Sequence, residues 1–180
     1  YPSSAESPHD LVENSHASTA ISYAYGLAVA RDAAVARGGD DTAVVAVIGD
    51  GAVTGGLADE ALNNFGATGR RAVIVLNDNG RCYAPTVSRL TLAGPAGGDA
   101  GDPAAFFTAL GLDYVGPIDG HDIAALEPVL RDAAARERPV VVHVLTHKGE
   151  GYLPAESDDE KRLHDIGAFD PETGVPVGAN

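Results

Sequence analysis

The chain has 180 residues, enough for one domain with a sizeable hydrophobic core. Its 26 acidic and 12 basic residues give a net charge of −14, and such a surface repels nucleic-acid phosphates and anionic lipids, so we expect neither a nucleic-acid nor a membrane partner. Cys82 is the single cysteine, which excludes an internal disulfide and a cysteine-built zinc site. Neither a membrane-spanning apolar run nor a signal-peptide pattern is found, so we expect a cytoplasmic protein.

Helix-like and strand-like patterns alternate along the chain. Residues 1–14 are polar and turn-rich, and Asn14 or Ser15 is the expected cap of the first helix, which Gly38 and Gly39 close. Unbroken apolar runs predict strands that are buried on both faces of a parallel sheet. The predicted elements are a helix at 17–36, a strand at 43–48, a helix at 54–67, a strand at 72–76, a helix at 104–110, a short strand at 114–115, a helix at 122–136 and a strand at 140–145.

Two segments fall outside these elements. Residues at about 88–103 are rich in glycine and proline and predict a mobile loop, and residues at about 150–180 predict an irregular tail with an extended path over the surface. We expect residues 1–180 to form a single domain. The alternation of strands and helices predicts the α/β class, with a mainly parallel sheet and helices on both faces.

Polar turns directly follow the strands predicted at 43–48 and 72–76. The first turn is Gly49-Asp50-Gly51-Ala52, and the second is Asn77-Asp78-Asn79-Gly80. A right-handed crossover between the two strands would make them parallel neighbours. Ligands of open α/β sheets gather outside the carboxyl ends of the strands, so the two turns are expected to meet where a ligand binds.

The side chains of these turns suit a divalent metal and a diphosphate. The carboxylate of Asp50 and the amide oxygen of Asn79 are hard ligands of the kind that Mg²⁺ prefers, and the carbonyl of Arg81 is a candidate third ligand. Gly51 and Ala52 bring bare N–H groups to the expected start of a helix, where an anion is favoured. We therefore predict a metal and diphosphate site at this edge.

Two other interpretations of the same residues were weighed. Either turn alone is a common turn sequence with no function. A dinucleotide site of the Rossmann type fits less well, because Thr54 stands where the third glycine of its motif belongs. Asn77 likewise replaces the acidic residue that would bind the ribose.

The Gly-Asp-Gly … Asn pattern resembles the diphosphate- and magnesium-binding motif of thiamine-diphosphate enzymes. Longer stretches narrow this to the 1-deoxy-D-xylulose-5-phosphate synthase family of transketolase-like enzymes, and the likeness covers nearly the whole chain except residues 88–103. The stretches that carry it are 14–22, 47–52, 60–64, 115–122, 146–152, 154–156, His164 and 169–171.

The resemblance implies a thiamine-diphosphate-binding fold, represented by its diphosphate-binding domain, with thiamine diphosphate and Mg²⁺ as cofactors. It implies that Asp50 and Asn79 hold the metal, to which Arg81 adds its carbonyl. Ser15 is a small departure, because the family usually has glycine there. The implied cofactor contacts are Ser15, His16, Ala17, Gly51, Ala52, Asn79 and Tyr152, and the implied catalytic residues are His16, Lys148 and His164. For His121 we expect a structural role.

The sequence departs from the family in two larger respects. Family members have a longer segment before the strand predicted at 114–115, and they carry an upstream part of this domain and two downstream domains that this sequence does not include. The resemblance implies that a downstream pyrimidine-binding domain supplies the glutamate that activates the cofactor. We therefore expect a separate chain or domain that carries the pyrimidine-binding half, and a hetero-oligomer.

Three hypotheses for the function follow. The chain is the diphosphate-binding subunit of an enzyme that transfers a two-carbon unit from a ketose or 2-oxo acid to an aldehyde. Alternatively, it is a fragment of a complete synthase that condenses pyruvate with glyceraldehyde 3-phosphate. A third hypothesis is a non-catalytic scaffold that retains the fold, which the presence of Asp50, Asn79, His16 and Lys148 disfavours.

Overall fold

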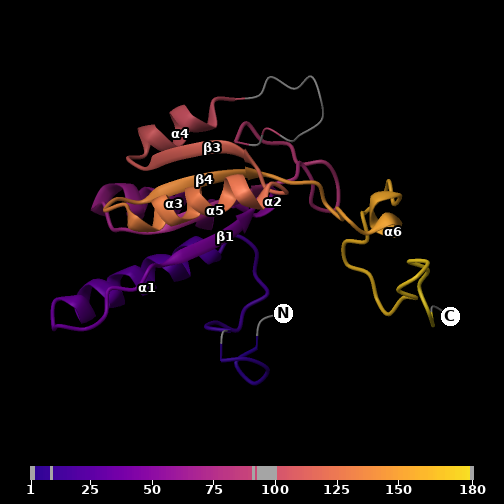
Figure 1. Ribbon diagram of the computed structural model, residues 1–180, viewed down its shortest axis with the longest axis horizontal. Helices are drawn as coiled ribbons and strands as arrows, with labels where there is room; N and C mark the ends of the chain where they lie inside the picture. Colours follow the sequence, from indigo (N-terminus) through magenta and orange to yellow (C-terminus); the bar gives the residue numbers. More distant parts are fainter. Residues whose placement is uncertain (1–2, 9, 91, 93–100, 179–180) are drawn as a thin grey trace.

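The computed structural model describes residues 3–8, 10–90, 92 and 101–178. A four-stranded sheet forms its centre, and each pair of neighbouring strands in it is parallel (Figure 1). In spatial order the strands are β1 (Val45–Gly49), β2 (Val73–Asp78), β4 (Val140–Leu145) and β3 (Asp113–Asp119). The predicted α/β class with a parallel sheet is confirmed.

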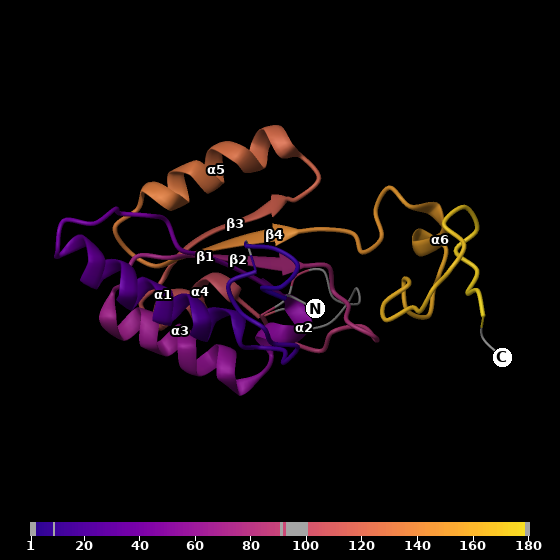
Figure 2. The same ribbon diagram turned by 90° about the horizontal axis from the view of Figure 1, so that it is seen from below.

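Helices cover both faces of this sheet (Figure 2). One face packs against α1 (Ala20–Val35), α3 (Gly56–Thr68) and α4 (Pro103–Ala109), and the other against α5 (Ile123–Ala135). Two further helices have a single turn each. Helix α2 (Asp50–Val53) directly follows β1, and α6 (Leu153–Glu156) lies in the tail. In the described part of the chain, no helix is both long and apolar enough to cross a membrane.

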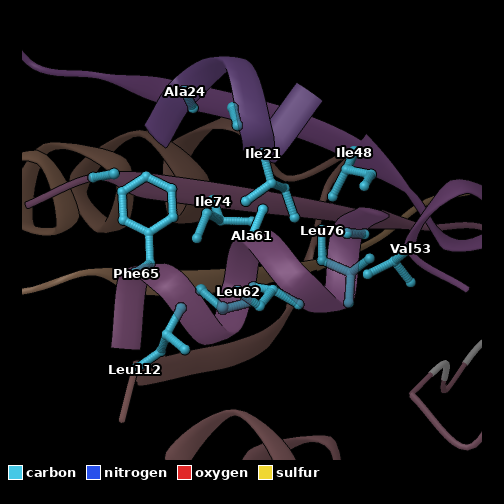
Figure 3. Packing of buried hydrophobic residues seen from close by; sticks show 14 of the residues in the cluster. Ile21, Ala24, Ile48, Val53, Ala61, Leu62, Phe65, Ile74, Leu76 and Leu112 are labelled. Atoms are coloured by element: carbon cyan, nitrogen blue, oxygen red, sulfur yellow. The ribbon is translucent and has the colours of Figure 1, made fainter. Parts of the chain in front are cut away.

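Each face has its own hydrophobic core. On the first face Phe65 of α3 packs with Ile21 of α1 and Ile74 of β2, and all three are almost fully buried (Figure 3). On the second face Ala133 of α5 packs against Val142 of β4. Burial of these apolar side chains holds the strands in place and thereby positions the loops at their ends.

Strand β1 differs from the prediction of burial on both faces. It is the edge strand, and its burial alternates, with Val45 and Val47 exposed by 53% and 63%. The reason is the position of α5, which contacts β3 and β4. The central strands β2 and β4 are the ones largely buried on both faces, as expected for a parallel sheet.

Several boundaries also differ from the predictions. Helix α1 begins at Ala20 and not at 17, and neither Asn14 nor Ser15 caps it: the Asn14 side chain bonds instead to Thr19 Oγ1 at 3.0 Å. The helix predicted at 54–67 is α3, which begins at Gly56, and the separate turn α2 precedes it at Asp50–Val53. A Cβ on Gly55, between them, would lie 2.0 Å from Ser18 Oγ. Strand β3 has seven residues where two were predicted.

The loop predicted at about 88–103 lies largely outside the described residues. Its described end is ordered by Asp102, whose carboxylate accepts a hydrogen bond from Ala105 N at 3.0 Å and so caps α4. The tail leaves the sheet after β4 and forms a small lobe beside it (Figures 1 and 2). Turns, α6 and an antiparallel bridge between Phe169 and Pro176 make up this lobe, so the predicted extended path over the surface is wrong.

Candidate metal and diphosphate site

Asp50 and Asn79 lie at the same edge of the sheet, the one formed by the carboxyl ends of its strands. In the parallel pair β1–β2, Gly49 lies opposite Asn77, so the residues that follow each strand are close in space. The main-chain N–H of Asn79 lies close enough to the Asp50 carboxylate to lower its pKa. The structure thus brings together the two residues that were predicted to hold the metal.

The Asp50 side chain is buried but incompletely partnered. The residue is 2% exposed, and within the described part of the chain its Oδ2 atom has no hydrogen-bond partner. Burial, and then the nearby Asp78 carboxylate, raise the pKa of Asp50, while the Thr86 hydroxyl and the N–H groups of Asn79 and Asp50 act in the opposite direction. A buried carboxylate oxygen without a partner costs free energy that a cation would offset. This donor set fits Mg²⁺.

The turn after Asn79 is compact. Asn79 Oδ1 accepts a hydrogen bond from Arg81 N at 3.2 Å, and an amide oxygen has a second lone pair for a metal. Thr86 N donates to Gly80 O at 2.8 Å, and Cys82 N donates to Ala84 O at 3.0 Å. These bonds close the loop without the carbonyl of Arg81, the predicted third ligand.

The Arg81 side chain reaches across to the tail. Its guanidinium donates to the carbonyls of Asp159, at 2.8 Å, and Glu160. The loop that carries Asn79 is therefore tied to the lobe beyond β4.

Gly51 and Ala52 lie on α2, against two other segments of the chain. A Cβ on Gly51 would lie 2.9 Å from Cys82 Cβ, so glycine allows the Asn79 loop to approach α2. Ala52 O accepts a hydrogen bond from Ser18 Oγ at 2.6 Å, which holds the segment before α1 against α2. We expected these two residues at the start of a helix whose dipole favours an anion. That expectation is wrong, because α2 has only four residues and carries little macrodipole. The N–H groups of Gly51 and Ala52 are still candidate donors to an anion.

Lys148 and His164, far apart in the sequence, are in contact. Lys148 Nζ contacts His164 Nδ1 and donates to Cys82 O at 3.1 Å. Burial lowers the pKa of Lys148, and Arg81 adds to this, against the attraction of Cys82 and Asp50. The ring centroid of Tyr83 lies 4.2 Å from that of His164, with the two rings tilted by 38°. Lys148 also lines a cavity of about 260 Å³ with Asn79, Gly80, Arg81, Pro85, His147 and Arg162.

The other predicted cofactor residues lie further from this cluster. Ser15, His16 and Ala17 are exposed, and the contacts of His16 are local: its N–H bonds to Asn14 and its Nδ1 lies 3.1 Å from Ala17 O. Tyr152 belongs to the tail, where its hydroxyl donates to the Pro171 carbonyl at 2.8 Å. The contacts of Tyr152 and His16 do not link them to Asp50 or Asn79.

His121 joins the ends of β3 and β4. Its Nε2 atom accepts a hydrogen bond from His147 N at 2.9 Å, in agreement with the structural role expected for it. With Glu150 the two histidines form an exposed cluster whose possible metal-ligand atoms lie within 4.8 Å of one another. Because the Nε2 lone pair of His121 is already used, this cluster is a poorer metal site than the Asp50–Asn79 edge.

Sequence reasoning missed four residues beside the site. Ser18 and Thr86 gave no signal, because serine and threonine are common in turns. Asp78 was visible within the second turn but had no assigned role, and His143 was visible as a lone histidine in an apolar strand. Asp78 and His143 prove to be fully buried and bonded to each other at 2.9 Å.

Comparison with known proteins agrees with the earlier resemblance. The family described as 1-deoxy-D-xylulose-5-phosphate synthase matches residues 1–93 and 99–146. Relatives with that name include a protein of Frankia casuarinae, 47% identical over 218 residues that cover 100% of this chain, and one of Thermobifida fusca, 48% identical over 98% of it. The chain spans 33% of the length of each of these relatives.

A solved structure is also similar. It is an enzyme from Mycobacterium smegmatis assigned as thiamin diphosphate-dependent, with 28% identity and a TM-score of 0.51 over 71% of this chain and 22% of that one. The alignment with the Frankia protein extends over 218 positions, more than the 180 residues of this chain, so that relative carries insertions within the shared region. Together these matches establish that the chain belongs to the 1-deoxy-D-xylulose-5-phosphate synthase family.

Proposed function

We propose that this chain forms the diphosphate- and magnesium-binding part of a thiamine-diphosphate-dependent transferase. The reaction moves a two-carbon unit from a 2-oxo acid or ketose donor to an aldehyde acceptor, as the resemblance to transketolase-like enzymes implies. One observation carries the proposal: the unpartnered, buried Oδ2 of Asp50 at the edge it shares with Asn79, in a chain of this family.

Each residue of the edge has a role in this proposal. The side chains of Asp50 and Asn79 and the carbonyl of Arg81 hold Mg²⁺, and the N–H groups of Gly51 and Ala52 face the diphosphate. When bound, thiamine diphosphate supplies the carbon–carbon bond chemistry. The protein's own contribution is to fix the diphosphate end and thereby the orientation of the cofactor.

Lys148 and His164 serve the substrates. Their contact places two basic side chains beside the cavity that Asn79 also lines. Burial lowers the pKa of Lys148, which makes its amine easier to deprotonate and so better suited to proton transfer than an exposed lysine. Lys148 therefore binds the anionic group of a substrate or transfers a proton, and His164 orients it. His16, Ser15, Ala17 and Tyr152 complete the cofactor contacts once the cofactor and the second half of the site are in place.

The second half of the site comes from a pyrimidine-binding unit. The chain corresponds to 33% of the length of these relatives, and in our proposal the Asp50–Asn79 site would hold only the diphosphate end of the cofactor. The unit is either a separate subunit, which makes a hetero-oligomer, or another domain of the same polypeptide. The mass of the intact native protein distinguishes these two cases.

The test is a calorimetric titration of the chain with thiamine diphosphate, alone and with the pyrimidine-binding unit of the native enzyme. We expect binding that requires Mg²⁺ and is abolished by a chelator. Thiamine, which lacks the diphosphate, is the control ligand and should bind without dependence on Mg²⁺ or fail to bind. Absence of Mg²⁺-dependent heat in both arrangements would contradict the proposal and favour a scaffold that retained the fold.

A further inference from the structure

A buried hydrogen-bonded chain runs across three strands towards the candidate metal site. Tyr114 of β3 lies with its hydroxyl 2.8 Å from His143 Nδ1, and His143 of β4 lies with its Nε2 2.9 Å from Asp78 Oδ2, at the end of β2. Both His143 and Asp78 are 0% exposed. The ring nitrogens of His143 therefore take their hydrogen bonds from Tyr114 and Asp78, because water does not reach a fully buried side chain.

The chemistry of the three groups sets the direction of the bonds. Burial, and then the carboxylates of Asp102 and Asp78, raise the pKa of Tyr114, so its hydroxyl keeps its proton and donates to His143 Nδ1. The other ring nitrogen of His143 then carries the hydrogen and donates to Asp78. The imidazole of His143 thus has a partner for each of its two ring nitrogens.

Asp78 also accepts hydrogen bonds from the loop that follows it. Its Oδ1 accepts a hydrogen bond from Gly80 N at 3.1 Å, which closes the turn around Asn79. Its Oδ2 accepts a second from Leu92 N at 2.5 Å. One carboxylate therefore anchors both ends of the 80–92 segment, which contains the carbonyl of Arg81.

A role in packing alone explains this arrangement poorly. The other residues of β4 are valines and a leucine, so an apolar side chain at position 143 would satisfy the core without any polar partner. A buried polar group costs free energy unless it is hydrogen-bonded, whereas a fully satisfied network fixes a single arrangement. The three polar groups converge on the one turn that carries Asn79.

We propose that Tyr114, His143 and Asp78 form a positioning network that sets the Mg²⁺ affinity of the site without contacting the metal. His143 holds the Asp78 carboxylate, and Asp78 holds the Asn79–Arg81 turn in the conformation that binds the ion. This inference rests on the proposed function, since it assigns the support of that same metal site.

Three substitutions separate this role from simple packing. Tyr114→Phe removes only a hydroxyl and keeps the ring, which stacks 6.0 Å from Phe107. His143→Leu removes both hydrogen bonds, and His143→Gln retains a donor for Asp78. Tyr25→Phe is the matched control, because Tyr25 is another partly buried tyrosine. Its ring centroid lies 5.1 Å from that of Phe65, and its hydroxyl helps to raise the pKa of Arg70, at the opposite end of the sheet.

The measurement is a Mg²⁺ titration of the chain with its pyrimidine-binding unit at saturating thiamine diphosphate. Loss of an outer-shell partner typically weakens metal binding by about 10–100-fold, and we expect at least about 10-fold for His143→Leu. Tyr114→Phe should weaken it by about 5-fold, the equivalent of one hydrogen bond. His143→Gln, which keeps the donor for Asp78 but loses the bond to Tyr114, should weaken it by the same factor of about 5. Tyr25→Phe should stay within about 2-fold of the unmodified protein.

Thermal unfolding with and without Mg²⁺ and cofactor completes the test. If the network only supports packing, the variants lose the same stability in both conditions and keep their Mg²⁺ affinity, and the inference is overturned. If His143→Leu does not fold, Tyr114→Phe and His143→Gln still decide. If the unmodified protein itself shows no Mg²⁺-dependent binding, the proposed function fails. If every variant binds Mg²⁺ as the unmodified protein does, only the inference about the network fails.

Discussion

The two ends of the sheet both carry charged side chains and a cavity. They differ in whether those charged side chains are paired with one another. Where the strands begin, Arg31 pairs with Asp32 at 2.6 Å, Arg70 pairs with the same Asp32, and Arg71 pairs with Asp41. The cavity there is about 600 Å³, larger than the cavity of about 260 Å³ at the other end. Cavity size therefore does not identify the site.

At the end where the strands finish, the carboxylate of Asp50 is not paired with a basic side chain of the described residues and is available to a ligand. Among the residues that the structure describes, the buried Asp50 Oδ2 has no hydrogen-bond partner, whereas at the opposite end Arg70 Nε is an unpartnered nitrogen of a guanidinium that is otherwise paired. A buried oxygen without a partner is costly in the ligand-free protein. The comparison shows that the unmatched acceptor, and not the amount of charge, marks the functional end.

The pKa values of two aspartates express the same contrast. Burial acts to raise the pKa of Asp32, but the hydrogen bonds and charges of Arg31 and Arg70 outweigh it and lower the value. Burial and the Asp78 carboxylate raise the pKa of Asp50. Without metal, Asp32 stabilises the fold above its ordinary pKa and loses this as the pH falls, whereas ionisation of Asp50 removes stability as the pH rises through its raised pKa.

The largest expected effect tests the functional end directly. Since loss of an outer-shell partner alone costs about 10–100-fold, Asp50→Asn should weaken Mg²⁺-dependent binding of thiamine diphosphate by more than about 100-fold. Calorimetry measures this, with Asp32→Asn as the control that should bind normally. Equal binding by the two variants would erase the distinction between the ends.

Lys148 tests whether substrate chemistry also belongs to this end. Lys148→Met should lower turnover of the native enzyme by about 100-fold or more, because it removes a group placed for proton transfer or anion binding. Cofactor affinity should be unchanged, as measured by calorimetry next to steady-state kinetics. Lys161→Met, at an exposed position of the tail, is the control. Full activity in Lys148→Met would remove Lys148 from the site.

Two glycines sharpen the comparison at the level of the backbone. Gly51→Ala places a Cβ 2.9 Å from Cys82 Cβ, and because such overpacking costs about 1–3 kcal/mol, cofactor binding should weaken by about 10-fold. Gly26→Ala, inside α1 with no atom within 4 Å of the added Cβ, should raise the free energy of unfolding by about 0.5–1 kcal/mol and leave binding intact. Chemical denaturation and calorimetry check both, and normal binding by Gly51→Ala would argue against a tight cradle.

The smallest effects concern the stability of the ligand-free chain. At pH 7 Asp32→Asn should lower the free energy of unfolding by about 0.5–1 kcal/mol, and the difference should vanish as the pH falls through the lowered pKa of Asp32. Asp50→Asn should raise stability at pH 7, and this gain should also vanish in acid. Urea unfolding across pH measures both signs, and a destabilised Asp50→Asn would contradict our interpretation of its burial.

Much of the architecture was predictable because its signals are local. Strand β4 runs over Val140–Leu145 as predicted, and helix α5 begins behind Asp122, whose side chain accepts from Ala125 N at 3.0 Å. The meeting of Asp50 and Asn79 was also predictable, since both directly follow apolar strands joined by one crossover. Apolar runs, helix caps and short crossovers act over a few residues or follow a general rule of chain topology.

The remaining features depend on contacts between distant segments. The sequence alone determined the α/β class, the parallel pairing of β1 with β2 and the polar edge at their ends. The strand order, the exposure of Val45 and Val47 at the sheet edge, the Lys148–His164 contact and the Tyr114–His143–Asp78 chain emerged only in three dimensions. The physical reason is that these features arise where helices and strands pack together, and no local pattern records which distant side chain will lie opposite.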